Sequence, residues 1–256
     1  MLFKIKIWQF FVLKILTLFS IQLGQAGSFN INPVQINFNK DQKIETLIIT
    51  NYDSNPLTVH LKVKKWHQKN GENFYVDTKD LLMAPPIATI DANSSQVIRL
   101  ALKAPRHDHN ENAYRLFITE IPNLESHNVT QTGLNFTLNI SMPIFVHPLN
   151  DASVEPVFQA SISQGQLRLK NSGRRHGHLK SVHIPGVTKQ PIEITRYILP
   201  QQESLINLPQ TNGVQGLRLV ADINNQKRTL DVSQESQNSS FASNFKLTTD
   251  AATSQR

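Results

Sequence analysis

Apolar and polar positions alternate in short runs along most of the chain after residue 28. The clearest run lies at residues 134–146, LNFTLNISMPIFV. Its apolar positions, which are separated from one another by Asn, Thr or Ser, are Leu134, Phe136, Leu138, Ile140 and Met142. Side chains two positions apart share one face of a β-strand, whereas helical spacing would scatter them around an axis. The run therefore predicts a strand with one apolar face, and Pro143 must interrupt its pairing on at least one side.

The residues before this run predict more strands of the same kind. Alternating or β-branched segments cover residues 34–38, 43–50, 57–66, 96–102 and 113–122. Between them, Asn70-Gly71 is a strong hairpin signal, and Pro85-Pro86 restricts residues 81–87 to an edge strand or to a strand that changes sheets. About seven strands in about 120 residues is the count of an immunoglobulin-like β-sandwich.

A second β module is predicted at residues 157–232, where short apolar runs are separated by turns such as Asn171-Ser172-Gly173. The chain therefore divides into five parts. They are a signal peptide (residues 1–26), an N-terminal immunoglobulin-like domain (27–148), a linker (149–156), a C-terminal β-sandwich (157–232) and a tail (233–256). The tail is rich in Ser, Gln, Asn and Thr, and we expect it to be disordered.

The first 26 residues have the pattern of a secretory signal peptide. Three lysines precede an apolar run at residues 15–23, and Gly24-Gln25-Ala26 supplies the small residues that a signal peptidase needs. The alternative is a membrane anchor, but the run is too short to span a bilayer core of roughly 30 Å. Cleavage after Ala26 lowers the formal net charge from +7 to +4, because the segment holds three lysines and no acid. We expect export and no stable membrane insertion.

Composition and motifs exclude several classes of function. The chain has no cysteine, so it has neither disulfides nor thiolate metal sites. Its residual basic charge suits an acidic surface or a peptide carboxylate, and an exported chain without a long basic stripe is not expected to bind nucleic acid. A Gly-rich phosphate loop, a nucleophile elbow and a catalytic pair of acids are all missing from the sequence. We therefore expect neither an enzyme nor a bound cofactor.

Histidine pairs raise one rival class, a metal-binding β-sandwich of the copper–zinc kind. His107 and His109 form one pair, and His176 and His178, followed by His183, form the other. Neither pair has a matched carboxylate or Cys partner in the sequence, so we expect no metal. A second alternative is an exported adhesion or pilin-like module that binds through its own loops.

Several motifs, taken in order, resemble the periplasmic chaperones of the chaperone–usher pilus pathway. In the first module they are Trp66, Asp80-Leu81-Leu82, Pro85-Pro86, Gln96-Val97-Ile98-Arg99-Leu100, Glu111, Tyr114-Arg115-Leu116, Glu120-Ile121-Pro122 and Pro143-Ile144-Phe145-Val146-His147-Pro148. In the second they are Asn171-Ser172-Gly173 with His176, and Tyr197-Ile198-Leu199-Pro200. The resemblance covers Phe29 to about Val232. It implies an all-β fold of two immunoglobulin-like sandwiches in an L-shaped arrangement, located in the periplasm.

The resemblance also implies a mechanism and two kinds of partner. Pilus subunits of this pathway are incomplete sandwiches, and the chaperone fills their open groove with a strand of its own before an outer-membrane usher receives them. Pilus chaperones are an established example of strand addition to a sheet edge. Carried over to this sequence, Val34 and Ile36 flank the same edge from the first strand. The donor strand carries the five apolar residues Leu134, Phe136, Leu138, Ile140 and Met142.

The sequence departs from the family at charged positions. Better-known members anchor the subunit's C-terminal carboxylate with an Arg and a Lys, where this chain has Gln35 and Pro143. The form Met142-Pro143-Ile144-Phe145 resembles the divergent, archaic branch of the family. Arg115 is the first substitute candidate and Arg99 the second, because a guanidinium grips a carboxylate bidentately. Relatives lock their two modules together with an acid, an Arg and an Asp from the second module. This chain has Glu111 and His147 at the first two of these positions, and Asp222 is the candidate for the third.

Overall fold

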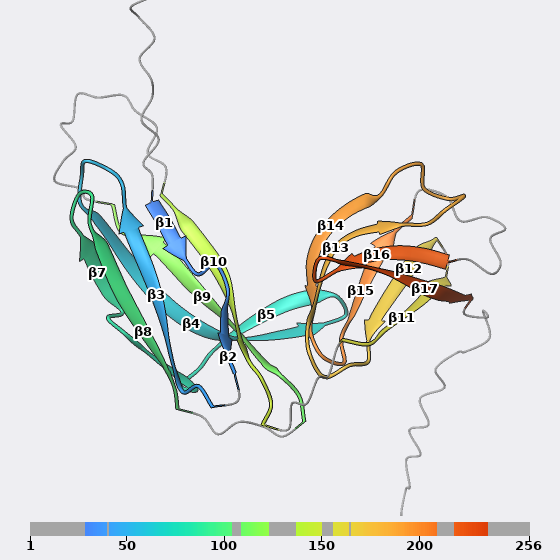
Figure 1. The fold of residues 1–256 in the computed structure, drawn as a ribbon, viewed down its shortest axis with the longest axis horizontal. Helices are drawn as coiled ribbons and strands as arrows, with labels where there is room; N and C mark the ends of the chain where they lie inside the picture. The colour runs from blue at the N-terminus through green and yellow to red at the C-terminus, as the bar shows by residue number, and fades with distance from the viewer. Residues whose placement is uncertain are drawn as a thin grey trace, which may run out of the picture.

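A computed structural model of the chain describes residues 29–39, 41–103, 109–122, 137–149, 156–163, 165–208 and 218–234. The predicted signal peptide, most of the linker and nearly all of the tail lie outside these ranges, as do Leu134, Phe136 and His107. The described residues form β-strands in two lobes that stand at an angle to each other (Figure 1). This arrangement confirms the predicted fold of two immunoglobulin-like domains. No helix in the described ranges is long and apolar enough to cross a membrane.

The first lobe packs two sheets face to face. One sheet has the order β1 (Phe29–Asn32), β3 (Ile44–Asn51), β8 (Ser95–Leu102) and β6 (Leu81–Ala84). The other has the order β2 (Ile36–Phe38), β10 (Asn139–Val146), β9 (Asn112–Glu120), β4 (Leu57–Lys69) and β5 (Glu72–Asp77), with β7 (Ile87–Ile90) also paired to β4. Alternate side chains of both sheets fill the space between them, and Leu47, Ile98, Leu116 and Ile144 are fully buried there.

Two segments of the first lobe change sheets. Pro85 and Pro86 separate β6, which pairs with β8, from β7, which pairs with β4 in the opposite sheet. This confirms the prediction made from the two prolines, since proline cannot donate to a central ladder. The N-terminal segment that contains β1 and β2 also changes sheets. β1 pairs with β3 in one sheet, and β2 pairs with β10 in the other.

The second lobe is built from the remaining strands. Their order is β14 (Ile192–Ile198), β13 (Gly177–His183), β16 (Arg218–Ile223), β17 (Gln226–Gln234), β11 (Phe158–Ser163), β12 (Gln166–Asn171) and β15 (Glu203–Asn207). β17 joins both halves of this order, because residues 226–231 pair with β16 and residues 232–234 pair with β11. Leu167, Leu179 and Leu219 lie in its core with no exposed surface.

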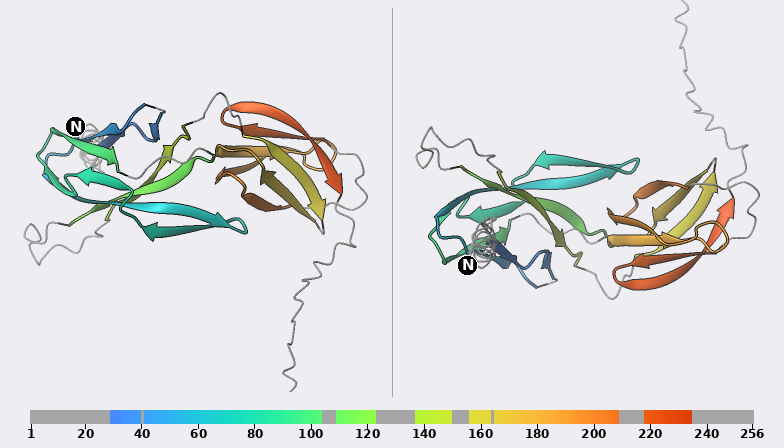
Figure 2. Two further views of the ribbon diagram at one scale, coloured as in Figure 1. Left: turned by 90° about the horizontal axis from the view of Figure 1, so that it is seen from below. Right: turned by 90° about the horizontal axis from the view of Figure 1, so that it is seen from above.

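The hairpin of β4 and β5 connects the two lobes (Figures 1 and 2). Its turn at Asn70-Gly71 reaches β15, so that a Cβ on Gly71 would lie 3.8 Å from the carbonyl oxygen of Glu203. At the base of the hairpin, Trp66 packs with Phe145 and Leu199 in a small apolar cluster that draws residues from both domains. The two domains therefore meet through packed side chains as well as through the connecting chain.

Candidate binding edge and domain junction

The N-terminal half of β10 is an open sheet edge. β10 pairs with β9 along its whole length, from Asn139 to Val146. On the other side β2 pairs only with Ile144–Val146 of β10. Within the part of the chain that the structure describes, no strand therefore pairs with that side of residues 139–143. Such an edge is a template for an added strand.

Two hydrogen bonds show which backbone groups face the open side. Glu120 N donates to Leu138 O at 2.9 Å, and His147 N donates to Phe38 O of β2 at 3.0 Å. Because bonded and non-bonded pairs alternate along antiparallel strands, even-numbered residues of β10 bond to β9 and odd-numbered ones point toward β2. Asn139 and Ser141 thus direct their N–H and C=O groups outward. The N–H that Pro143 lacks also belongs to this side, so the proline removes nothing from the β9 ladder.

The even-numbered side chains of β10 face the core of the first domain, and their burial increases along the strand. Leu138, just before β10, is 37% exposed, Ile140 is partly buried, and Met142 is only 4% exposed. The prediction that Met142 belongs to an accessible apolar face is therefore wrong, because Met142 packs inside its own domain. The accessible part of the face is Leu138 with the edge of Ile140.

The first-strand residues differ from each other in the same way. Val34 lies in the bend between β1 and β2 and is 75% exposed. Ile36 begins β2 opposite Ile144 and is 1% exposed. Both side chains were expected to line the edge. Ile36 instead belongs to the core, whereas Val34 is exposed and remains a candidate for the edge. β2 is nevertheless the outermost strand of its sheet, so its backbone extends the edge formed by β10.

Arg115 lies beside this edge, on the face of the sheet that points away from the core. It sits in β9 opposite Pro143, and its Nη1 lies 3.5 Å from the carbonyl oxygen of Ser141. Its guanidinium carbon is 4.2 Å from the ring centre of Trp66 and 5.3 Å from that of Tyr197. Trp66 belongs to the first domain and Tyr197 to the second, so Arg115 stands where both domains meet the open edge.

The charge of Arg115 is poorly compensated. Its Nε is buried without a hydrogen-bond partner, and no carboxylate of the described residues forms an ion pair with it. Burial lowers the pKa of Arg115, while Tyr75 and Tyr197 act in the opposite direction. A half-buried arginine flanked by aromatic rings remains charged and lacks an anion. This is the environment in which an incoming carboxylate gains most.

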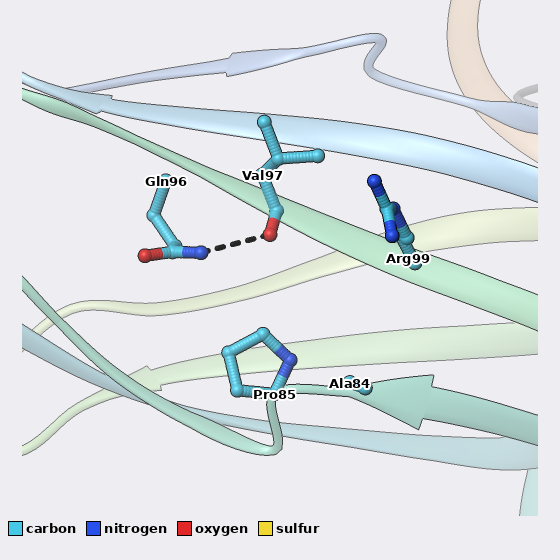
Figure 3. A pocket seen from close by; sticks show the side chains of 5 residues that line it. All are labelled: Ala84, Pro85, Gln96, Val97 and Arg99. Atoms are coloured by element: carbon cyan, nitrogen blue, oxygen red, sulfur yellow. Dashed lines mark hydrogen bonds between the residues drawn. The ribbon is translucent and has the colours of Figure 1, made fainter.

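Arg99 lies elsewhere. It belongs to β8 in the other sheet, where it pairs with Thr46 and Ala84. Its side chain lines a surface pocket together with Ala84, Pro85, Gln96 and Val97 (Figure 3). The two arginines therefore do not form one site, and only Arg115 lies beside the edge of β10.

The predicted acid and histidine of the domain lock do come together, with a different third member. Oε2 of Glu111 lies 3.0 Å from Nδ1 of His147, and Oε1 lies 2.6 Å from Nδ1 of His176 in the second domain. Burial alone would raise the pKa of Glu111, but the hydrogen bonds and charges of the two histidines lower it to about 2. Asp222 was expected in this place. It lies instead in β16, opposite Ser181 and Lys227.

Three histidines of the predicted pairs, His109, His176 and His178, lie near the junction. The ring of His176 stacks on Phe145 at 3.5 Å, and the ring of His178 stacks on Tyr197 at 4.1 Å. His109 accepts a hydrogen bond from Arg174 through its carbonyl oxygen. Among the residues that the structure describes, no three metal-ligating side chains come together as a metal site. The sequence predicts a turn at Asn171-Ser172-Gly173, but nothing in it indicates that the residues after this turn contact the first domain.

Comparisons with known proteins identify the family of the first domain. Residues 28–151 match the family described as pili and flagellar-assembly chaperone, PapD N-terminal domain. A comparison with curated protein sequences gives no match.

Solved structures share the fold of both domains. A chain of the CsuC–CsuE chaperone–tip adhesion subunit complex, from archaic Csu pili of Acinetobacter baumannii, is 20% identical with a TM-score of 0.67, over 82% of this chain and 100% of that one. A chain of the Salmonella enterica SafA pilin–SafB chaperone complex is 17% identical with a TM-score of 0.61, over 81% and 96%. The E. coli chaperone DraB is 15% identical with a TM-score of 0.59, over 82% and 97%. Residues 28–151 thus match the family of pili and flagellar-assembly chaperones, and the two domains together have the fold of the solved pilus chaperones.

Proposed function

We propose that this protein is a periplasmic chaperone that captures pilus subunits by donor-strand addition and passes them to an outer-membrane usher. The observation that carries the proposal is the open N-terminal half of β10, where Asn139 and Ser141 direct backbone groups away from the sheet. A subunit that lacks a strand could pair with these groups and cover the apolar side chains that precede and begin β10. The leader at residues 1–26 supports export to the periplasm.

The energetics suit a complex that forms firmly and still releases its cargo. Full burial of one large apolar side chain contributes roughly 1.5–3 kcal/mol. Leu138 is 37% exposed and Ile140 is partly buried in the free protein, so each would contribute only a part of this. The added strand supplies main-chain hydrogen bonds, and the ordering of both partners offsets much of the gain. Leu134 and Phe136 are proposed to extend the same apolar face toward the subunit.

Arg115 is the proposed anchor for the C-terminal carboxylate of the subunit. It lies beside the open edge, its Nε has no partner, and its guanidinium faces two aromatic rings. A carboxylate that reached this position would form a charge-assisted, bidentate pair with the guanidinium. The anchor would also fix the register of the added strand along β10.

The proposal is tested by the substitution Leu138→Glu, which places a charge on the accessible part of the apolar face. Co-expression with a pilus subunit from the same genome, followed by affinity purification of the chaperone, measures capture. We expect the variant to retain its fold. The amount of co-purified subunit should fall at least about 10-fold, because a carboxylate would be buried in the subunit groove. The matched control is Leu82→Glu, since Leu82 is 56% exposed in the opposite sheet. If Leu138→Glu captured as much subunit as wild type, the proposal of strand addition at this edge would be wrong.

A further inference from the structure

Two side-chain amides of the β4–β5 hairpin hold the rings that flank Arg115. Gln68 reaches across the domain boundary, where its Nε2 donates to Tyr197 O and its Oε1 accepts from Leu199 N, both at 2.8 Å. The same Nε2 lies 2.9 Å from Oδ1 of Asn73. That oxygen also accepts the indole N–H of Trp66 at 3.0 Å. One short network therefore fixes the backbone at Tyr197 and the ring of Trp66.

The geometry of the two rings explains why their positions matter for Arg115. The ring centres of Trp66 and Tyr197 are 5.7 Å apart and their planes make an angle of 80°. The guanidinium carbon of Arg115 lies within 5.3 Å of both centres. The rings thus form a corner with one wall from each domain, and the cation sits in that corner. Attraction between a cation and ring faces depends on this kind of close placement.

We infer that Gln68 and Asn73 are positioning residues for a two-domain carboxylate site centred on Arg115. This inference rests on the proposed function and adds a dependence on the second domain. Arg115 is carried by β9 of the first domain, but half of its aromatic corner is Tyr197, which Gln68 ties to the hairpin. A change in the angle between the domains would move that wall and release the guanidinium. Carboxylate binding and the relative position of the domains are therefore coupled.

The test uses the whole chaperone and two synthetic peptides of the last strand of a pilus subunit from the same genome, one with a free C-terminal acid and one with an amide. Gln68→Ala and Asn73→Ala should each weaken binding of the acid peptide by about 5-fold to 10-fold. Binding of the amide peptide should change less than about 2-fold, because the amide does not use the charge of Arg115. Arg115→Ala should abolish the preference for the acid, and the double variant Gln68→Ala/Arg115→Ala should bind no more weakly than Arg115→Ala alone.

Two controls separate positioning from general stability. Gln166→Ala removes another amide, which donates to Asn207 Oδ1 in the second domain, and it should leave the acid preference unchanged. Arg99→Ala removes a distant arginine from the surface and should also have no effect. The inference fails if Gln68→Ala weakens acid and amide peptides equally, or if its effect adds to that of Arg115→Ala. If Arg115→Ala itself leaves the acid preference intact, the proposed anchor fails, and the inference fails with it.

Discussion

Glu111 is the residue on which charge from both domains converges. Its carboxylate has no exposed surface, and its two oxygens approach one histidine from each domain. A buried carboxylate is costly unless it is paired, so the two imidazoles are needed for it to remain ionised. The lock is therefore electrostatic as well as apolar, and acid should weaken it.

The loss of this lock on acidification can be predicted with its sign. The pKa of Glu111 is lowered from 4.5 to about 2 in the folded protein. A lowered folded-state pKa gives a stabilisation that is complete above about pH 4.5 and disappears as the pH falls toward 2, and its size is about 3 kcal/mol. We expect urea unfolding to show wild type more stable than Glu111→Gln by about this amount at pH 6. The difference should shrink steadily toward pH 2, and a difference that stays constant over this range would contradict the assignment.

At the scale of the element, β10 shows what its sequence could and could not specify. The alternation of Leu138, Ile140 and Met142 predicts one shared face, and in the structure Ile140 and Met142 both pack on the core of the first domain, while Leu138 precedes β10 and is 37% exposed. The pattern does not show whether this face is covered by the protein's own core or by a strand of a bound partner, because both require apolar side chains at the same positions. Only the structure shows that coverage ends between Met142 and Leu138.

Other elements also separate the features that a local sequence pattern predicts from those that depend on contacts between distant residues. The sheet change at Pro85-Pro86 was predictable because proline acts through its own backbone. The third member of the domain lock was not, because His176 meets Glu111 across 65 residues of sequence. Gln68 likewise gives no signal in the sequence, since its partners Tyr197 and Leu199 lie in the other domain. Fold class and strand positions follow from local patterns, whereas the junction requires the packed molecule.

At the scale of the whole molecule, we expect the apolar cluster around Trp66 to couple the unfolding of the two domains, because it draws residues from both of them. Trp66 is 3% exposed and packs with Phe145 of the first domain and Leu199 of the second. Trp66→Ala should cost about 3–5 kcal/mol and remove most of the contact between domains. We expect calorimetry to show two separate unfolding transitions in place of one. Phe74→Ala is the matched control, because Phe74 is an aromatic residue of the same hairpin that is 46% exposed. A single transition at the wild-type temperature would show that the domains are not coupled through this cluster.

The most direct test of strand addition is the exchange rate of individual backbone amides of β10, followed by nuclear magnetic resonance. In the free protein the amides of Ile140 and Met142 should exchange slowly, because they bond to β9, and those of Asn139 and Ser141 should exchange quickly. Binding of a pilus subunit should slow Asn139 and Ser141 by at least about 100-fold and change Ile140 and Met142 far less. If Asn139 and Ser141 still exchanged at their free rates in a stable complex, no strand would have been added at this edge.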